Sequence, residues 1–112
     1  MIIQVEEKGS VVVIVVKEER LDAHNSSELK TQMLNLFEDG KTNLIVNLDT
    51  VRFVDSSGLG SLVSGFKNAS ARNGNLKLCN LQPQVKSMFE LTRLHRVFEI
   101  FPNLDDALAS FD

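Results

Sequence analysis

Hydrophobic residues at the start of the chain first alternate with polar ones and then form a continuous run. Ile3 and Val5 have polar neighbours, Gly9-Ser10 offers a turn, and an unbroken β-branched run follows at 11–16. Alternation with a period of two predicts a strand with one polar face, whereas the unbroken run predicts a strand buried on both sides. We therefore expect an antiparallel hairpin of two strands.

Helical spacing of apolar residues predicts four helices further along. The first begins at Asn25-Ser26-Ser27-Glu28, which resembles a capping box in which Asn25 accepts from the first turn and Glu28 reaches back. The second follows Asp55 and closes near 73–74, the third begins at Pro83, and a short last helix follows Pro102-Asn103. The inward-facing positions are Leu29, Met33, Leu36, Phe37, Leu59, Leu62, Val63, Phe66, Val85, Met88, Phe89, Leu104, Ala107, Leu108 and Phe111.

Short extended segments lie between these helices. We expect strands at 43–48 and 75–79, a short extended piece at 51–54, and a last strand at 96–100. Strands that alternate with helices favour a largely parallel sheet. The chain is therefore predicted to be one α/β domain over residues 1–112, with a mixed, mostly parallel β-sheet, an amino-terminal antiparallel hairpin and about four covering helices.

Composition and charge exclude several classes of function. The net charge is −3, and nucleic-acid binders usually carry a basic face, so a direct nucleic-acid partner is not expected. The apolar run at 11–16 is far shorter than the roughly twenty residues needed to cross a bilayer, and the amino terminus lacks the features of a signal peptide. We expect a cytoplasmic protein without a membrane partner, and a monomer by default.

The residues able to do chemistry form no recognisable catalytic or metal-binding set. The only cysteine, Cys79, lies in an apolar-alternating run and is interpreted as a buried structural thiol. His24 and His95 stand at positions typical of surface residues, and with one distant cysteine they make a poor metal-ligand set. The spacing of Gly58 and Gly60 matches neither a serine-hydrolase turn nor a complete phosphate-binding loop. We expect no catalytic residue, no metal and no cofactor, with nucleotide binding as a minor alternative.

The segment Asp55-Ser56-Ser57-Gly58 departs from an ordinary helix start. Asp55 or Ser56 fits a plain helix cap, which accounts for the polar residues. It does not account for Gly58 and Gly60, each of which costs on the order of 1 kcal/mol relative to alanine in a helix. Close packing against the sheet explains one glycine, whereas two suggest that something approaches this backbone. Because a helix amino terminus favours a phosphate, phosphorylation here is a candidate switch for a docked partner.

The run from Asn47 to Gly60, with Asp-Ser-Ser-Gly-Leu-Gly at 55–60, resembles the signature of anti-sigma factor antagonists, which are members of the STAS domain family. Leu21-Asp22-Ala23 and the Pro83-x-Val85 start of the third helix extend the likeness over almost the whole chain. The resemblance implies that Ser56, the first serine after the aspartate, is phosphorylated. The partner-binding residues that it implies are Asp22, Asp55, Ser56, Ser57, Gly58, Leu59 and Gly60.

The same resemblance implies a partner-switching cycle. The unphosphorylated protein binds an anti-sigma factor that is also an ATP-dependent serine kinase and frees a sigma factor; phosphorylation ends the interaction, and a serine phosphatase restores it. The chain is then a ligand and a substrate, not an enzyme. The alternative is a non-switching STAS subunit of a transport ATPase or a scaffold of a sensory complex. Two departures from the family pattern, at 17–20 and 92–95, lie in loops that the resemblance implies take part in partner selection.

Overall fold

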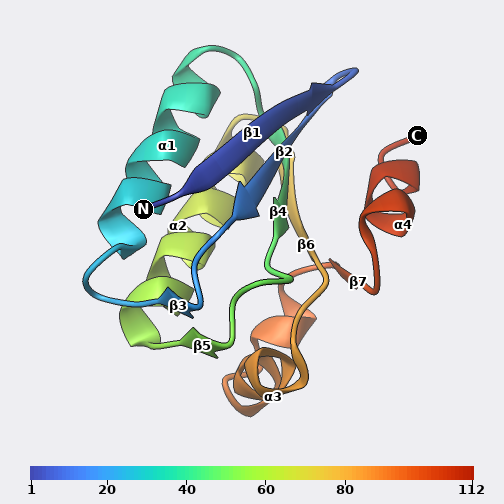
Figure 1. The fold of residues 1–112 in the computed structure, drawn as a ribbon. Helices are drawn as coiled ribbons and strands as arrows, with labels where there is room; N and C mark the ends of the chain where they lie inside the picture. The colour runs from blue at the N-terminus through green and yellow to red at the C-terminus, as the bar shows by residue number, and fades with distance from the viewer.

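A mixed five-stranded sheet runs through the centre of the structure, a computed structural model that describes residues 1–112 (Figure 1). Its strands are β1 (Ile3–Lys8), β2 (Val11–Val16), β4 (Asn43–Asn47), β6 (Asn75–Cys79) and β7 (Ile100–Phe101). They are ordered β1-β2-β4-β6-β7, with β1 antiparallel to β2 and every other neighbouring pair parallel. The predicted fold class, including its amino-terminal hairpin, is confirmed.

A second, two-stranded sheet lies at the end of the molecule where helix α2 (Ser56–Ala71) begins (Figure 1). In it β3 (Arg20–Leu21) pairs in parallel with β5 (Phe53–Val54). The extended piece predicted at 51–54 contains β5, but β3 was not predicted. A strand of two residues is defined by its pairing with a distant segment, and it leaves no periodic pattern of its own.

Helices cover both faces of the main sheet. They are α1 (Ser26–Glu38), α2 (Ser56–Ala71), α3 (Pro83–Leu91) and α4 (Leu104–Ala109), with a 3₁₀ turn η1 (Leu94–Arg96) after α3. Helices α1 and α2 lie side by side on one face, α4 lies on the other, and α3 packs at one end beside β5 (Figure 1). None of these helices combines the length and the apolar character that crossing a bilayer requires.

Alternate positions along the central strands supply two apolar clusters. The larger includes the fully buried Ile14, Val46 and Leu78 and lies against α1, α2 and α3. The smaller includes Val13 and Ile45 and lies against α4. Because helices cover both faces, β2 is buried on both sides, as its unbroken β-branched run predicts.

The start of α1 differs from the predicted capping box. Asn25 makes no side-chain hydrogen bond to the first turn. Its side-chain oxygen accepts from the Asp22 N–H at 2.9 Å, and its amide donates to the Arg20 carbonyl at 2.8 Å. Glu28 accepts from the ammonium of Met1 at 2.9 Å. The capping-box prediction was wrong because partners outside the helix engage both side chains.

The last strand lies further along the chain than the predicted segment 96–100. The 3₁₀ turn η1 occupies 94–96, and β7 is confined to 100–101. Phe98 packs edge-to-face against Phe66 and Phe89, with ring centroids 5.3 and 5.7 Å away. This aromatic packing draws Phe98 into the core, so the segment 96–100 is not one continuous strand.

Candidate functional site

The start of α2 is held by Asp55, whose two carboxylate oxygens accept from two different segments. Oδ1 accepts from the Gly58 N–H at 2.9 Å and caps the helix. Oδ2 accepts from the Ala23 N–H at 3.2 Å, in the loop before α1. Asp55 therefore satisfies a helix donor that has no partner within the helix and also ties together two loops. Of the two cap residues that the sequence allows, Asp55 is the one used.

Asp22 lies in the loop that Asp55 holds, and it is 9% exposed. Its Oδ1 accepts from the His24 N–H at 3.0 Å, and its Oδ2 accepts from Arg20 Nε at 3.3 Å. The His24 N–H lowers the pKa of the Asp22 carboxyl below its usual range, Arg20 lowers it further, and desolvation opposes both. Asp22 is therefore a fixed negative charge next to the start of α2.

Ser56 and Ser57 are the first two residues of α2, and both are exposed. The neighbouring Ser61 differs, because it is buried and its hydroxyl donates to the Gly58 carbonyl at 2.7 Å. A phosphate on Ser56 or Ser57 would lie in solvent at the positive end of the helix dipole. Because both serines are exposed, exposure does not distinguish them, and the assignment of Ser56 rests on its place in the motif.

The two glycines of the helix start meet different surroundings. A Cβ on Gly58 would lie 2.3 Å from the carbonyl oxygen of Leu21 and 2.8 Å from Cγ1 of Val54. A Cβ on Gly60 would meet no atom within 4 Å. Close packing against β3 and β5 therefore explains Gly58, as the sequence allowed for one of the pair. The open space at Gly60 is where a group from outside the chain could approach the backbone.

The residues predicted to bind a partner come together at this end of the molecule, with different degrees of exposure. The exposed ones are Ser56, Ser57 and Gly60. Asp55 is half-buried, whereas Asp22, Gly58 and Leu59 are buried. Leu59, at 6% exposure, belongs to the main core cluster. Its contribution to a partner surface would be to hold the turn in place.

Two residues that sequence reasoning did not assign to the site lie next to it. Arg20 and Phe53 are register partners across β3 and β5. The guanidinium carbon of Arg20 lies 4.2 Å from the centre of the Phe53 ring, and Phe53 is 42% exposed. Strand alternation was the available signal: if Val54 points inward, its neighbour Phe53 points outward.

The other chemistry-bearing residues lie apart. Cys79 is buried, and desolvation, with a smaller contribution from the charge of Asp49, raises the pKa of its thiol to about 11. The interpretation of Cys79 as a buried structural thiol is confirmed. His24 is exposed in the turn before α1 and His95 is exposed in η1, and no group of three or more histidine, cysteine or acidic side chains is placed to hold a metal ion.

The structure is a small α/β domain in which Asp55 ties the start of α2 to the loop before α1, and comparison with known proteins gives its family. The family model of the STAS domain matches residues 3–107. The chain belongs to the STAS domain family.

Two curated relatives are similar over most of their length. The chain is 26% identical over 102 residues to the anti-sigma F factor antagonist of Paenibacillus polymyxa, which covers 90% of this chain and 87% of that protein. It is 32% identical over 80 residues to the anti-sigma-B factor antagonist of Bacillus subtilis, which covers 71% of this chain and 72% of that protein.

Solved structures share the fold. An anti-sigma-factor antagonist (STAS) domain protein from Planctomyces limnophilus matches with a TM-score of 0.88 at 22% identity, over 96% of both chains. The Bacillus cell fate determinant SpoIIAA in its phosphorylated form matches with a TM-score of 0.78 at 23% identity, over 99% of this chain and 100% of that one. At these identities the likeness establishes the STAS fold.

Proposed function

We propose that this protein is an anti-sigma factor antagonist controlled by phosphorylation of Ser56. The unphosphorylated form binds an anti-sigma factor that is also an ATP-dependent serine kinase, and it thereby frees a sigma factor. The observation that carries the proposal is the position of Ser56, an exposed serine at the first residue of α2, on a turn that Asp55 ties to the neighbouring loop. The names of the two curated relatives support the antagonist role.

The unphosphorylated surface suits docking because it is small, exposed and already ordered. Ser57 and Gly60 carry little side-chain bulk, so the partner can approach the backbone of α2 closely. The hydrogen bonds of Asp22 and Asp55 hold the two loops in place before binding, which limits the ordering that association requires. Their carboxylates favour basic groups on the facing part of the partner.

A phosphate on Ser56 turns this surface off through its charge. Phosphoserine carries about −1.5 to −2 at neutral pH. In the free protein, solvent surrounds it and the helix dipole stabilises it by about 0.3–1 kcal/mol. In the complex the same charge is buried close to Asp22 and Asp55, which costs several kcal/mol. Since about 2.7 kcal/mol corresponds to a hundredfold change in affinity, one phosphate suffices to end the interaction.

The protein takes part in this cycle as a ligand and as a substrate, and it is not an enzyme. The kinase transfers the γ-phosphoryl group of ATP to the Ser56 hydroxyl oxygen and releases ADP. A serine phosphatase then hydrolyses the phosphoserine, releases inorganic phosphate and restores the hydroxyl. No cofactor, metal or nucleic acid is required on the antagonist itself, which acts as a cytoplasmic monomer.

A pull-down from the source cell's lysate tests the proposal. With magnesium and ADP, wild type is expected to recover a small ATP-binding serine kinase, identified by mass spectrometry, and Ser56→Asp is expected to lose it by a hundredfold or more. With ATP, the recovered kinase should phosphorylate wild type and the matched control Ser57→Ala, but not Ser56→Ala. Equal recovery of a transport ATPase or a large sensory complex by wild type and Ser56→Asp would contradict the proposal.

A further inference from the structure

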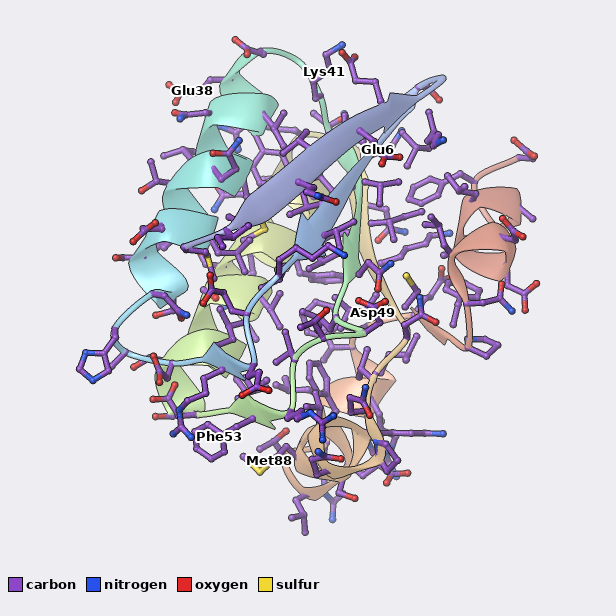
Figure 2. All side chains as sticks on the ribbon, viewed as in Figure 1. Glu6, Glu38, Lys41, Asp49, Phe53 and Met88 are labelled. Atoms are coloured by element: carbon purple, nitrogen blue, oxygen red, sulfur yellow. The ribbon has the colours of Figure 1, made fainter.

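The side chain of Phe53, two residues before the N-cap Asp55 of α2, is exposed. Phe53 is 42% exposed, although its strand neighbour Val54 is fully buried. Figure 2 shows Phe53 beside β5, at the end of the molecule where α3 and Met88 lie. A single exposed apolar side chain is ordinary in a folded protein, so it is the surroundings of Phe53 that distinguish it.

Arg20 occupies one face of the Phe53 ring and is itself held in place. Its guanidinium carbon lies 4.2 Å from the ring centroid, and its Nε donates to Asp22 at 3.3 Å. Asp22 is in turn fixed by the His24 N–H at 3.0 Å. These contacts favour one arrangement of the ring and the guanidinium before any partner arrives, so binding to them orders fewer side-chain torsions than binding to two mobile side chains.

The pair offers two kinds of contact to a molecule outside the chain. The side chain of Arg20 is 61% exposed, and Nε is the atom that donates to Asp22, which leaves the terminal amino groups available for a further partner. A guanidinium presents its donors in a planar fork that matches a carboxylate. The exposed part of the Phe53 ring offers apolar area beside this fork. The complementary group is thus a carboxylate next to an apolar side chain.

We propose that Arg20 and Phe53 form an anchor for the anti-sigma factor, in addition to the serine turn; the inference rests on the proposed function. The anti-sigma factor packs an apolar side chain on Phe53 and places a carboxylate on Arg20. Continuity with the serine turn identifies this occupant. Arg20 donates a hydrogen bond to Asp22, and the N–H of the next residue, Ala23, donates one to Asp55. The Arg20–Phe53 pair and the serine turn therefore belong to one surface. Aromatic and arginine side chains dominate the energetics of protein interfaces.

The sign of the charges along this surface selects the partner. The half-buried Asp55 favours a basic group opposite the serine turn, whereas the exposed Arg20 favours an acidic group. A protein with a uniformly basic face meets like charge at Arg20, and a uniformly acidic one meets like charge at the turn. Arg20 is therefore a specificity-determining residue, separate from the phosphorylated serine.

Isothermal titration of full-length variants with the purified anti-sigma kinase, in magnesium and ADP, tests this anchor. Phe53→Ala and Arg20→Ala are each expected to weaken binding tenfold or more, which is about 1.4 kcal/mol. The double variant should lose less affinity than the product of the two single fold-losses, because the two side chains act as a unit. Arg20→Lys keeps the charge but not the planar fork, so it should also weaken binding several-fold.

Two matched controls lie elsewhere on the helices. Leu34→Ala removes an aliphatic side chain that is 41% exposed on α1. Arg72→Ala removes a guanidinium that lies 5.5 Å from the Phe37 ring, at the far end of α2. Both controls should bind within about twofold of wild type, and the thermal unfolding midpoints of Phe53→Ala and Arg20→Ala should show that these variants are folded.

The outcomes separate this inference from the proposed function. If wild type binds the kinase and Ser56→Asp does not, while Phe53→Ala and Arg20→Ala bind as tightly as wild type, the anchor is refuted and the switch stands. If Leu34→Ala and Arg72→Ala lose as much affinity as the pair, the anchor is refuted as well. If wild type recovers no anti-sigma kinase from the lysate, both the proposed function and the anchor fall.

Discussion

Gly58 and Gly60 are two residues apart in α2, yet alanine should have opposite effects at the two positions. At Gly58 the added Cβ would lie 2.3 Å from the Leu21 carbonyl oxygen, a backbone atom that moves only if β3 moves. We expect Gly58→Ala to lower the free energy of unfolding by about 1–3 kcal/mol. At Gly60 the Cβ enters open space, so Gly60→Ala should raise it by up to about 1 kcal/mol. Urea unfolding of both variants measures the difference.

Partner binding gives the second readout for this pair. If the open space over Gly60 is filled by the anti-sigma factor, Gly60→Ala should be more stable than wild type and bind more weakly. A stabilised variant with unchanged binding would show that no partner approaches this backbone. Equal stability of Gly58→Ala and Gly60→Ala would contradict the packing explanation itself.

Asp22 makes stability depend on pH at the acidic end of the range. The His24 N–H and Arg20 lower its pKa in the folded protein, whereas in the unfolded chain that pKa is about 3.9. A lowered folded pKa contributes stability that is present above the unfolded value and is lost as pH falls through the folded one. Asp22→Asn removes this contribution, so the stability gap between wild type and variant should shrink below about pH 4. Urea unfolding of both proteins between neutral and acidic pH measures this gap in stability. A gap that does not change with pH would contradict the prediction.

Helix α4 packs on the smaller apolar cluster, and one buried charged side chain, Lys77, bonds to its carboxyl end. Lys77 on β6 is 5% exposed, and its ammonium donates to the Ser110 carbonyl at 3.2 Å and to the Ser110 hydroxyl at 2.8 Å. It also pairs with Glu99 at 2.9 Å. The last turn of α4 carries no basic residue, so Lys77 supplies the positive charge that a helix carboxyl end favours.

Replacing this lysine should loosen α4 over the thiol that it helps to cover. Cys79 belongs to the apolar cluster under α4, and its raised pKa keeps the thiol protonated. Lys77→Met should therefore let a thiol reagent label Cys79 several-fold faster at mildly alkaline pH. Lys41→Met, which removes a lysine paired with Glu7 on the exposed surface, is the control and should label like wild type. Labelling of Lys77→Met at the wild-type rate would show that other contacts hold α4.

The elements differ in how plainly their residues show them in the sequence, for physical reasons. Strands β2, β4 and β6 were predicted because each is long enough to show its apolar pattern and each is bounded by turn residues. Strand β3 and the Arg20–Phe53 pair could not be predicted from the sequence, because both depend on a contact between segments far apart in the chain. The last strand was misplaced for two reasons: the packing of Phe98 in the core, and a turn of the chain through η1 after Arg93, which adopts the left-handed region with φ of 62°.

For the whole molecule, the position of Ser56 predicts that binding and stability respond separately to charge. Ser56 is exposed at the first residue of α2, so an added negative charge stays hydrated. The helix dipole favours that charge by about 0.3–1 kcal/mol, so Ser56→Asp should unfold at the wild-type temperature or a few degrees higher. Calorimetry measures the unfolding temperature of Ser56→Asp, which is then compared with the expected hundredfold loss of its affinity for the partner.

Ser61 provides the contrasting variant in the same helix. It is 4% exposed, so Ser61→Asp would bury a charge and should lower the unfolding temperature strongly. If Ser56→Asp also lowered that temperature, its loss of binding would follow from damage to the fold, and phosphorylation would act by changing conformation. If Ser56→Asp unfolds like wild type and still fails to bind, the phosphate acts through its charge at the interface, because the fold that presents it is unchanged.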